Sequence, residues 1–244
     1  MINYPQEFLI ACGIHRLPPE ELLQQFVNRF RYSGLMCGAE DGTEHAVNGV
    51  VSDYIQSVDY DRDFFKADLS LHLKWLKKLN AVKDKHSELP EKELQSRINK
   101  TVKACKKVAC TKFAQPTSVC VPGGYTVQLP NDFVVLCFLN GISAGSVLQY
   151  LADNISLAKY LATNQFGIAA VNHFMYFFQD MAEELFHDSK ALETRGFIRH
   201  HQGLADLYEQ LEGESDFDTR LLKLTKQYKD WYEEIKHVPV KAMS

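Results

Sequence analysis

A faint internal repeat constrains the fold of this chain more than any other feature of its sequence. Residues 8–30 and 133–155 align at a constant offset of 125 residues. The offset produces four identities: Phe8 with Phe133, Cys12 with Cys137, Leu23 with Leu148, and Gln24 with Gln149. Six further pairs are apolar at both positions: Leu9, Ile14, Leu17, Leu22, Phe26 and Phe30 meet Val134, Leu139, Ile142, Val147, Leu151 and Ile155.

The repeat preserves packing positions rather than reactive groups, because most of its matching residues are apolar. One residue of slippage later, Ala46-Val47-Asn48 also meets Ala170-Val171-Asn172. Self-similarity at a fixed spacing is typical of a duplicated structural unit. The sequence therefore predicts two similar halves, and the alternative is a chance match. At 244 residues the chain is long enough for both halves to bury a substantial core.

Composition places the chain among globular proteins and gives little information about its chemistry. Hydrophobic residues make up 45% and charged residues 24% of the sequence, and the net charge of −4 alone indicates neither nucleic acid nor membrane. The first ten residues lack the basic and apolar regions of a signal peptide. Six cysteines are scattered without a CxxC pair, so we interpret them as small buried hydrophobes. We expect a cytoplasmic protein.

Helical periodicity dominates the chain and predicts an all-α fold. We expect a helical half over residues 1–114, a connector over 115–130 that forms a turn or small β-hairpin around Pro122-Gly123-Gly124, and a second helical half over 131–244. The predicted helices span 19–30, 44–57, 63–79, 91–112, 131–140, 143–161, 166–187 and 218–236. Gly196 and Gly203 predict a loop between the last two helices.

The strongest charge asymmetry lies between Lys66 and Lys112. Thirteen Lys and Arg residues and five Asp and Glu residues in this stretch give +8, which leaves −12 for the remainder of the chain. Lys100, Lys103, Lys106 and Lys107 are candidates for contact with phosphates or with an acidic protein. The alternative is a solvated helix face whose charge balances acidic neighbours. No aromatic residues alternate with these lysines to stack on single-stranded bases.

A second candidate is a helix-turn-helix pattern in Cys137–Leu151. Gly141 would form the turn, Ser143 would cap the second helix, and Val147 and Leu151 would face the core. In that interpretation Gln149 could pair with adenine and Ser146 could contact a base or a phosphate. The segment carries no Lys or Arg, so the favoured interpretation is a structural corner between two helices.

A third candidate is Arg195-Gly196-Phe197-Ile198-Arg199-His200-His201. The Arg and His spacing resembles the motif of the helical HEPN ribonucleases. That resemblance implies that Arg195 and His200 would cleave RNA at a dimer cleft. The alternative is an exposed loop.

Motifs for metal and cofactor chemistry are absent or incomplete in the sequence. Glu184 and His187 match the Glu-x-x-His spacing of di-iron bundles, but a second such motif is absent. No glycine-rich phosphate loop or nucleophile elbow is present. We therefore expect no catalytic residue, cofactor or metal.

The function predicted from these features is that of a non-enzymatic, intracellular helical interaction protein, an adaptor or regulator. Its partner would be another protein, with nucleic acid as an alternative through the 66–112 lysine stretch. The alternative function is that of a helix-turn-helix DNA-binding regulator, and the third is that of a HEPN-like ribonuclease.

Overall fold

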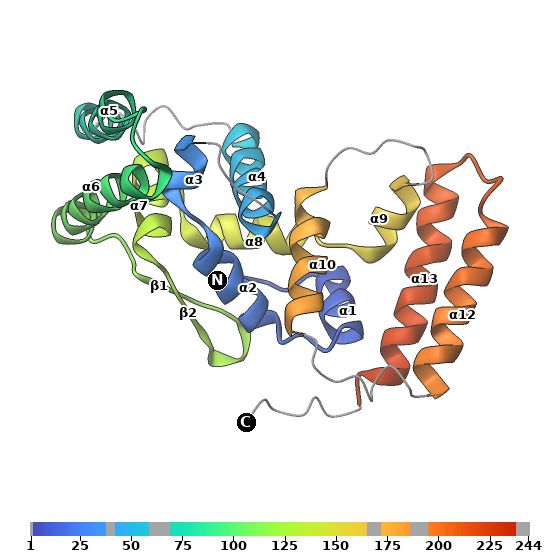
Figure 1. Cartoon of the computed structure of the whole chain (residues 1–244). Coiled ribbons are helices and arrows are strands. Elements are labelled where there is room, and N and C mark those ends of the chain that lie inside the picture. The colour runs from blue at the N-terminus through green and yellow to red at the C-terminus, as the bar shows by residue number, and fades with distance from the viewer. Residues whose placement is uncertain (1, 38–41, 59–68, 165–171, 186–194, 238–244) are drawn as a thin grey trace. The chain divides into compact units, whose positions relative to one another are not determined.

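The structure is a computed structural model, which describes residues 2–37, 42–58, 69–164, 172–185 and 195–237 (Figure 1). The described part of the chain is predominantly helical, and its one sheet has two strands. The prediction of an all-α protein is confirmed at this level. The chain divides into two compact units, which are unit 1 (residues 1–3 and 23–151) and unit 2 (residues 4–22 and 152–244). Each unit therefore combines segments from both of the predicted halves, whose boundaries stay a prediction.

Unit 1 contains most of the N-terminal helices, the connector and the two helices that follow it. Its elements are α2 (Pro19–Arg29, from Leu23 onward), α3 (Tyr32–Cys37), α4 (Gly42–Ser57), α5 (Leu69–Lys85), α6 (Glu91–Phe113), β1 (Ser118–Cys120), β2 (Thr126–Gln128), α7 (Asn131–Asn140) and α8 (Ala144–Asn154, up to Leu151). The strands β1 and β2 pair antiparallel, with Val119 opposite Val127. The predicted hairpin is thus confirmed, and Gly123 and Gly124 in its turn have the positive φ of 80° that glycine adopts without strain.

The helix α7 lies at the centre of unit 1, where it packs on α6, α5 and α3. Almost every residue of α7 is buried, so it has no polar face for water. The ring of Phe133 meets those of Phe26 and Phe30 edge-on, with centroids 6.1 and 5.8 Å apart. Phe138 meets the rings of His72 on α5 and Phe113 on α6 at 4.7 and 5.2 Å. Aromatic contacts of this kind stabilise a core beyond the burial of their area.

Within unit 1, two glutamine side chains form hydrogen bonds with extended backbone segments. The Gln24 amide donates to the Gln128 carbonyl oxygen at 2.9 Å and accepts from the Gln128 N–H at 2.8 Å. The Gln149 amide donates to the Asn3 carbonyl oxygen at 2.8 Å and accepts from the Asn3 N–H at 2.7 Å. Each side chain satisfies a backbone donor and acceptor that secondary structure leaves open.

Unit 2 is built around the C-terminal helix. Its elements are α1 (Gln6–Ile14), the first residues of α2, the end of α8, α9 (Leu157–Asn164), α10 (His173–Leu185), α12 (Arg195–Gln210) and α13 (Phe217–Ile235). The helix α13 packs on α9, α1 and α12, and Figure 1 shows α12 and α13 as adjacent helices joined by a short connection. Asp216 caps α13 by accepting the Thr219 N–H at 2.9 Å, which satisfies one of the open donors at the helix start.

The turns after α1 and α7 close in the same way. The Leu17 N–H donates to the Cys12 carbonyl oxygen at 2.9 Å, and the Ile142 N–H donates to the Cys137 carbonyl oxygen at 3.0 Å. Between them, Arg16 and Gly141 have φ of 56° and 61°. In each turn the N–H of the sixth residue donates to the carbonyl oxygen of the first, and the residue before the donor is left-handed. This arrangement is a common way for a helix to end. Glycine adopts that conformation freely, whereas Arg16 takes it at some cost.

Five pairs of helices begin at a nearly constant spacing along the chain, whereas α4 and α10 begin 131 residues apart. The first residues of α1, α2 and α3 precede those of α7, α8 and α9 by 125 residues, and those of α5 and α6 precede those of α12 and α13 by 126. The match between Asn48 and Asn172 does not extend to their local structure. Asn48 lies inside α4, whereas the Asn172 side chain accepts the Met175 N–H and caps α10.

Three of the predicted helix boundaries are wrong. The predicted helix 143–161 is two helices, α8 and α9, because Ser156 accepts the Lys159 N–H at 3.1 Å and starts a new helix. The predicted loop at Gly196 and Gly203 is part of α12. The predicted helix 63–79 continues to Lys85 as α5. Its first residues, 63–68, lie outside the described residues. The same holds for residues 166–171 and 186–187 of the predicted helix 166–187.

The described helices were also compared with the requirements of a membrane span. Within the described ranges, no single helix is long and apolar enough to cross a bilayer. The helices α7 and α8 reach that threshold only when counted together, and they are bent by 99° at the turn between them.

Candidate partner-binding surface

The predicted contact lysines all lie on α6, and the fold directs them away from the core. Leu94, Ile98, Val102, Cys105 and Ala109 form the buried stripe of this helix. At about 100° per residue, Lys100, Lys103, Lys106 and Lys107 fall within an arc of roughly 120° on the opposite side. Lys100, Lys103 and Lys107 are exposed and Lys106 is half-buried. We call these four residues the lysine face.

The lysine face holds its charge on a rigid support. The stripe beneath it packs on α7, α5 and α3 within unit 1, so the backbone that carries the lysines is fixed by a buried core. Within the described residues, none of the four ammonium groups forms a hydrogen bond or an ion pair. Other lysines of the basic stretch are engaged: Lys78 lies 4.4 Å from the centroid of the Trp75 ring, and Lys83 donates to the Met36 carbonyl oxygen.

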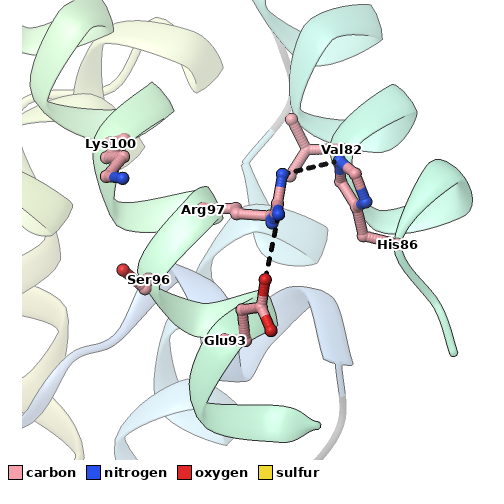
Figure 2. Close-up of a pocket in the computed structure, with 6 residues that line it drawn as sticks. All are labelled: Val82, His86, Glu93, Ser96, Arg97 and Lys100. Carbon is pink, nitrogen blue, oxygen red and sulfur yellow. Dashed lines mark hydrogen bonds and ion pairs between the residues drawn. The ribbon is translucent and has the colours of Figure 1, made fainter. Parts of the chain in front are cut away.

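A shallow hollow of about 310 Å³ adjoins the lysine face between the end of α5 and the start of α6. Figure 2 shows Arg97 between Glu93 and His86, with Ser96 and Lys100 on the neighbouring turns of α6. The Arg97 guanidinium donates to Glu93 Oε1 at 2.9 Å and lies 3.3 Å from His86 Nε2. Arg97 is therefore already engaged, and Lys100 supplies the other cation of this hollow.

His86 is poorly suited to add positive charge at this hollow. Its pKa lies below the ordinary value, first because the ring loses some hydration and then because Arg97 and Lys85 oppose a second positive charge nearby. A neutral imidazole can accept the Arg97 N–H through Nε2. The hollow is thus an edge of the lysine face rather than a separate charged site.

The other two predicted site residues, Ser146 and Gln149, lie on α8 and are engaged within unit 1. Ser143 caps α8 as predicted, because its Oγ accepts the Ser146 N–H at 3.0 Å, and the two hydroxyl oxygens are 2.7 Å apart. Gln149 binds the backbone of Asn3, as described above, and the neighbouring Tyr150 ring lies 5.2 Å from that of Tyr54. The structure therefore does not bring Ser146 and Gln149 together with the lysine face.

The HEPN-like segment lies at the start of α12, and its histidine faces inward. His200 is 6% exposed, and its ring stacks on Trp231 with a centroid separation of 5.6 Å. His200 Nε2 lies 2.9 Å from Glu234 Oε2, and Arg199 pairs with the same carboxylate. The proximity of His200 is the main reason why the pKa of Glu234 lies below its ordinary value. The side chain of Arg195 lies outside the described residues.

The cysteines of the described residues are not arranged as a reactive or metal-binding site. Cys12, Cys105 and Cys137 are buried, and burial raises the pKa of the latter two thiols to about 12, so they pack as small apolar side chains. Among the described residues, no group of three or more His, Cys, Asp or Glu side chains is placed to hold a metal ion. His187 of the Glu-x-x-His pattern lies outside the described residues.

Sequence reasoning overlooked a cavity in unit 2. The cavity has a volume of about 640 Å³. It is lined by residues from five helices, among them Ile14 of α1, Tyr160 of α9, Glu183 of α10 and Trp231 of α13, and by His15 just after α1. Its residues are far apart in the sequence, so no local motif could have revealed it.

Comparison of the chain with protein-family models, with curated proteins and with solved structures finds no match.

Proposed function

We propose that this protein is a non-enzymatic helical adaptor or regulator that binds an acidic partner protein through the lysine face of α6. The observation that carries the proposal is the placement of Lys100, Lys103 and Lys107. They are exposed, without hydrogen-bond or ion-pair partners among the described residues, and held on a helix whose opposite stripe is buried. Asp132 attracts the charge of Lys103 from α7, whereas Lys100 and Lys107 have no acidic partner among the described residues. A fixed array of exposed cations favours association with a surface of opposite charge.

Several features favour a protein partner over nucleic acid. The chain outside the basic stretch carries −12, which repels a long polyanion. Arginine suits planar, two-point recognition of phosphate better than lysine, and Arg97, the single arginine of α6, is engaged by Glu93. The α8 helix presents no cation to help hold DNA. Nucleic acid therefore stays the alternative, as weak binding without sequence preference.

The test measures binding of three labelled probes by fluorescence anisotropy: an oligoglutamate peptide, a duplex DNA and a single-stranded RNA of matched charge. We expect the peptide to bind, and we expect its affinity to fall as the salt concentration rises from about 50 to 200 mM. Replacing Lys103, Lys106 and Lys107 together by Gln should weaken this binding at least about tenfold, which corresponds to about 1.4 kcal/mol.

The matched control replaces Lys223, Lys226 and Lys229 by Gln. These lysines are exposed on α13, so the control makes the same change in net charge on another helix. An equal loss in the control would show that binding follows net charge and not the lysine face. If DNA or RNA bound more tightly than the peptide, the proposal of an acidic protein partner would be wrong and nucleic acid would be favoured. Tight, sequence-selective DNA binding that Gln149→Ala abolishes would favour the helix-turn-helix alternative.

We also infer that the chain contains two copies of one helical unit, and its hydrogen bonds support this. Gln24 and Gln149 are 125 residues apart, and so are their backbone partners Gln128 and Asn3. Two acidic residues, Glu7 and Asp132, are also 125 residues apart, while their partners, Ser156 and Tyr32, are 124 apart. Asp132 accepts the N–H of Tyr32 at the start of α3, and Glu7 accepts the hydroxyl of Ser156 just before α9. A chance alignment of apolar residues does not account for corresponding polar contacts.

The same contacts support an exchange of the first helices between the two copies. In unit 1, α7 of the second copy packs on α6 of the first copy, and in unit 2, α1 of the first copy packs on α13 of the second. The relation is that of a swapped dimer joined into one chain. We place the protein in the cytoplasm, where buried thiols such as Cys12, Cys105 and Cys137 stay reduced.

A further inference from the structure

We propose that the cavity of unit 2 binds a small organic cation with an apolar body. The inference goes beyond the proposed function, which uses the lysine face of unit 1. The cavity volume of about 640 Å³ lies within the range of small-molecule sites, roughly 300–1,000 Å³. Its walls come from α1, α9, α10, α12 and α13, so packing of several helices supports it.

Aromatic side chains form much of the cavity wall. Tyr228 and Trp231 are 5% and 4% exposed, and their rings are nearly parallel with centroids 6.4 Å apart. The His200 ring also stacks on Trp231, so Tyr228 and Tyr160 are the rings on which the cation would depend most. Tyr160 lines the cavity from α9, and Ile14, Leu157 and Leu204 add apolar surface. The faces of Trp and Tyr rings attract a cation held within about 6 Å of the ring centre, most strongly when water is excluded. An apolar ligand body gains further from burial here.

The charge of the cavity favours a cation over an anion. Among its described lining residues, Glu183 carries a carboxylate, none is Lys or Arg, and the two histidines are His15 and the exposed His201. His15 adds no positive charge near neutral pH, because burial lowers its pKa to about 4. Burial also keeps the Tyr228 hydroxyl protonated, since it raises the pKa of that group. An anion would therefore meet a like charge, whereas a cation meets one carboxylate and several aromatic rings.

The aromatic lining belongs to one of the two copies only. At the spacing of 126 residues that relates α6 to α13, Tyr228 and Trp231 correspond to Val102 and Cys105. Val102 and Cys105 are almost fully buried in unit 1, where α6 packs on α5 and α7. Duplicated units need the same packing, so an aromatic pair in one of them that also lines a cavity points to a use specific to that unit.

The experiment titrates the full-length chain with three small probes by calorimetry. The cationic probe is benzyltrimethylammonium, the neutral probe is its isostere in which carbon replaces nitrogen, and the anionic probe is phenylacetate. We expect the cation to bind at least about tenfold more tightly than its neutral isostere, and phenylacetate to bind most weakly. In a Trp75→Phe background, saturation with the cation should quench the fluorescence of Trp231.

Two variants test whether binding of the cation depends on the Glu183 carboxylate of this cavity. Glu183 is exposed on α10, so Glu183→Gln should fold normally and reduce the affinity for the cation about five- to tenfold without changing that for the neutral isostere. Glu212→Gln, which removes a charge from the exposed surface of unit 2, should change neither affinity. Equal binding of cation and isostere, preferred binding of phenylacetate, an unchanged affinity in Glu183→Gln, or no binding of any probe would each overturn the proposal.

Discussion

Gln24 and Gln149 make the same pair of hydrogen bonds to backbone segments that are themselves 125 residues apart. Gln24 binds both the N–H and the carbonyl oxygen of Gln128, and Gln149 binds both groups of Asn3. Each glutamine therefore holds the segment that precedes the first helix of the other predicted half. The relation is reciprocal, which agrees with the proposal that the chain contains two copies of one helical unit.

Removal of either glutamine side chain should destabilise the protein by a similar amount. Gln24→Ala and Gln149→Ala each delete two hydrogen bonds to the backbone, so we expect each to cost about 1–2 kcal/mol in the free energy of unfolding. Chemical denaturation measures this cost. The control is Gln95→Ala, which deletes only a surface hydrogen bond to Glu91 and should cost less than about 0.5 kcal/mol. A neutral Gln149→Ala would contradict the structural role assigned to this residue.

The repeat was visible in the sequence because apolar residues leave a periodic pattern, but the role of its polar members was not. Gln24 and Gln149 were recognised as an identity, and a base-reading role for Gln149 belonged only to the alternative helix-turn-helix interpretation. Their backbone partners, Gln128 and Asn3, lie just outside the aligned segments. A sequence pattern cannot show that a side chain hydrogen-bonds a distant backbone segment, because such a bond depends on how helices are placed by tertiary packing.

Glycine and serine positions explain the wrong element boundaries. Gly203 was expected to mark a loop, yet it lies within α12, and a Cβ at this position would come 3.1 Å from Gln227 Nε2 of α13. The glycine therefore permits close helix packing rather than a turn. Ser156 was expected inside one long helix, but it caps α9. An apolar stripe continues through both helices, so periodicity alone could not detect the break.

The candidate site was only partly accessible to sequence reasoning. The lysine face was identified, since charge and helical spacing are local properties, and the structure adds that its lysines oppose a buried stripe. The cavity of unit 2 was not identified, because residues as distant as His15 and Trp231 meet only in the folded chain.

Replacing a buried leucine of the repeat by alanine should lower the free energy of unfolding substantially. Leu23 and Leu148, a pair in the repeat, have no exposed surface, and the same holds for Phe26 and Leu151. Their burial agrees with the interpretation that the repeat preserves packing positions. Leu148→Ala should therefore cost about 2–5 kcal/mol, because it leaves a space that the core fills only in part. Leu222→Ala is the control, since Leu222 is 72% exposed, and it should cost less than about 0.5 kcal/mol. Similar denaturation midpoints for both variants would show that the core is assigned wrongly.

Exchange of first helices predicts how the chain responds to a cut in the connector. A protease site inserted between Gly123 and Gly124 lies in the turn of the β1–β2 hairpin, where both residues are exposed. After cleavage we expect the two fragments to stay together in size-exclusion chromatography without denaturant. The N-terminal fragment contributes α1 to unit 2, and the C-terminal fragment contributes α7 to unit 1.

The control for this cut is the same digestion in a denaturing concentration of urea, where the two fragments should separate. Fragments that also separate without urea, while each keeps its helical circular dichroism, would contradict the exchange. If the two fragments elute together without urea and lose their helicity cooperatively as urea is added, the exchange is supported. Each unit needs a helix from the other fragment.

His15 should make the stability of the protein depend on pH between about 4 and 6.5. Its ring meets Phe178 edge-on, with centroids 5.1 Å apart, and burial lowers its pKa from 6.5 to about 4. Above pH 6.5 the ring is neutral in both the folded and the unfolded chain, so the full stability is present. As pH falls from 6.5 towards 4, the unfolded chain takes up a proton that the folded chain does not, so the unfolded state is favoured.

The expected loss of stability from His15 is about 2–3 kcal/mol over this window. Urea unfolding at pH 7 and at pH 4.5 measures it in the parent chain and in His15→Gln, which cannot titrate. The variant should show a smaller difference between the two pH values than the parent. Gln179→Ala, at an exposed position on the same cavity and without a titratable group, is the control and should keep the parent's dependence. If His15→Gln keeps that dependence as well, another group is responsible, and His15 is not held neutral by burial.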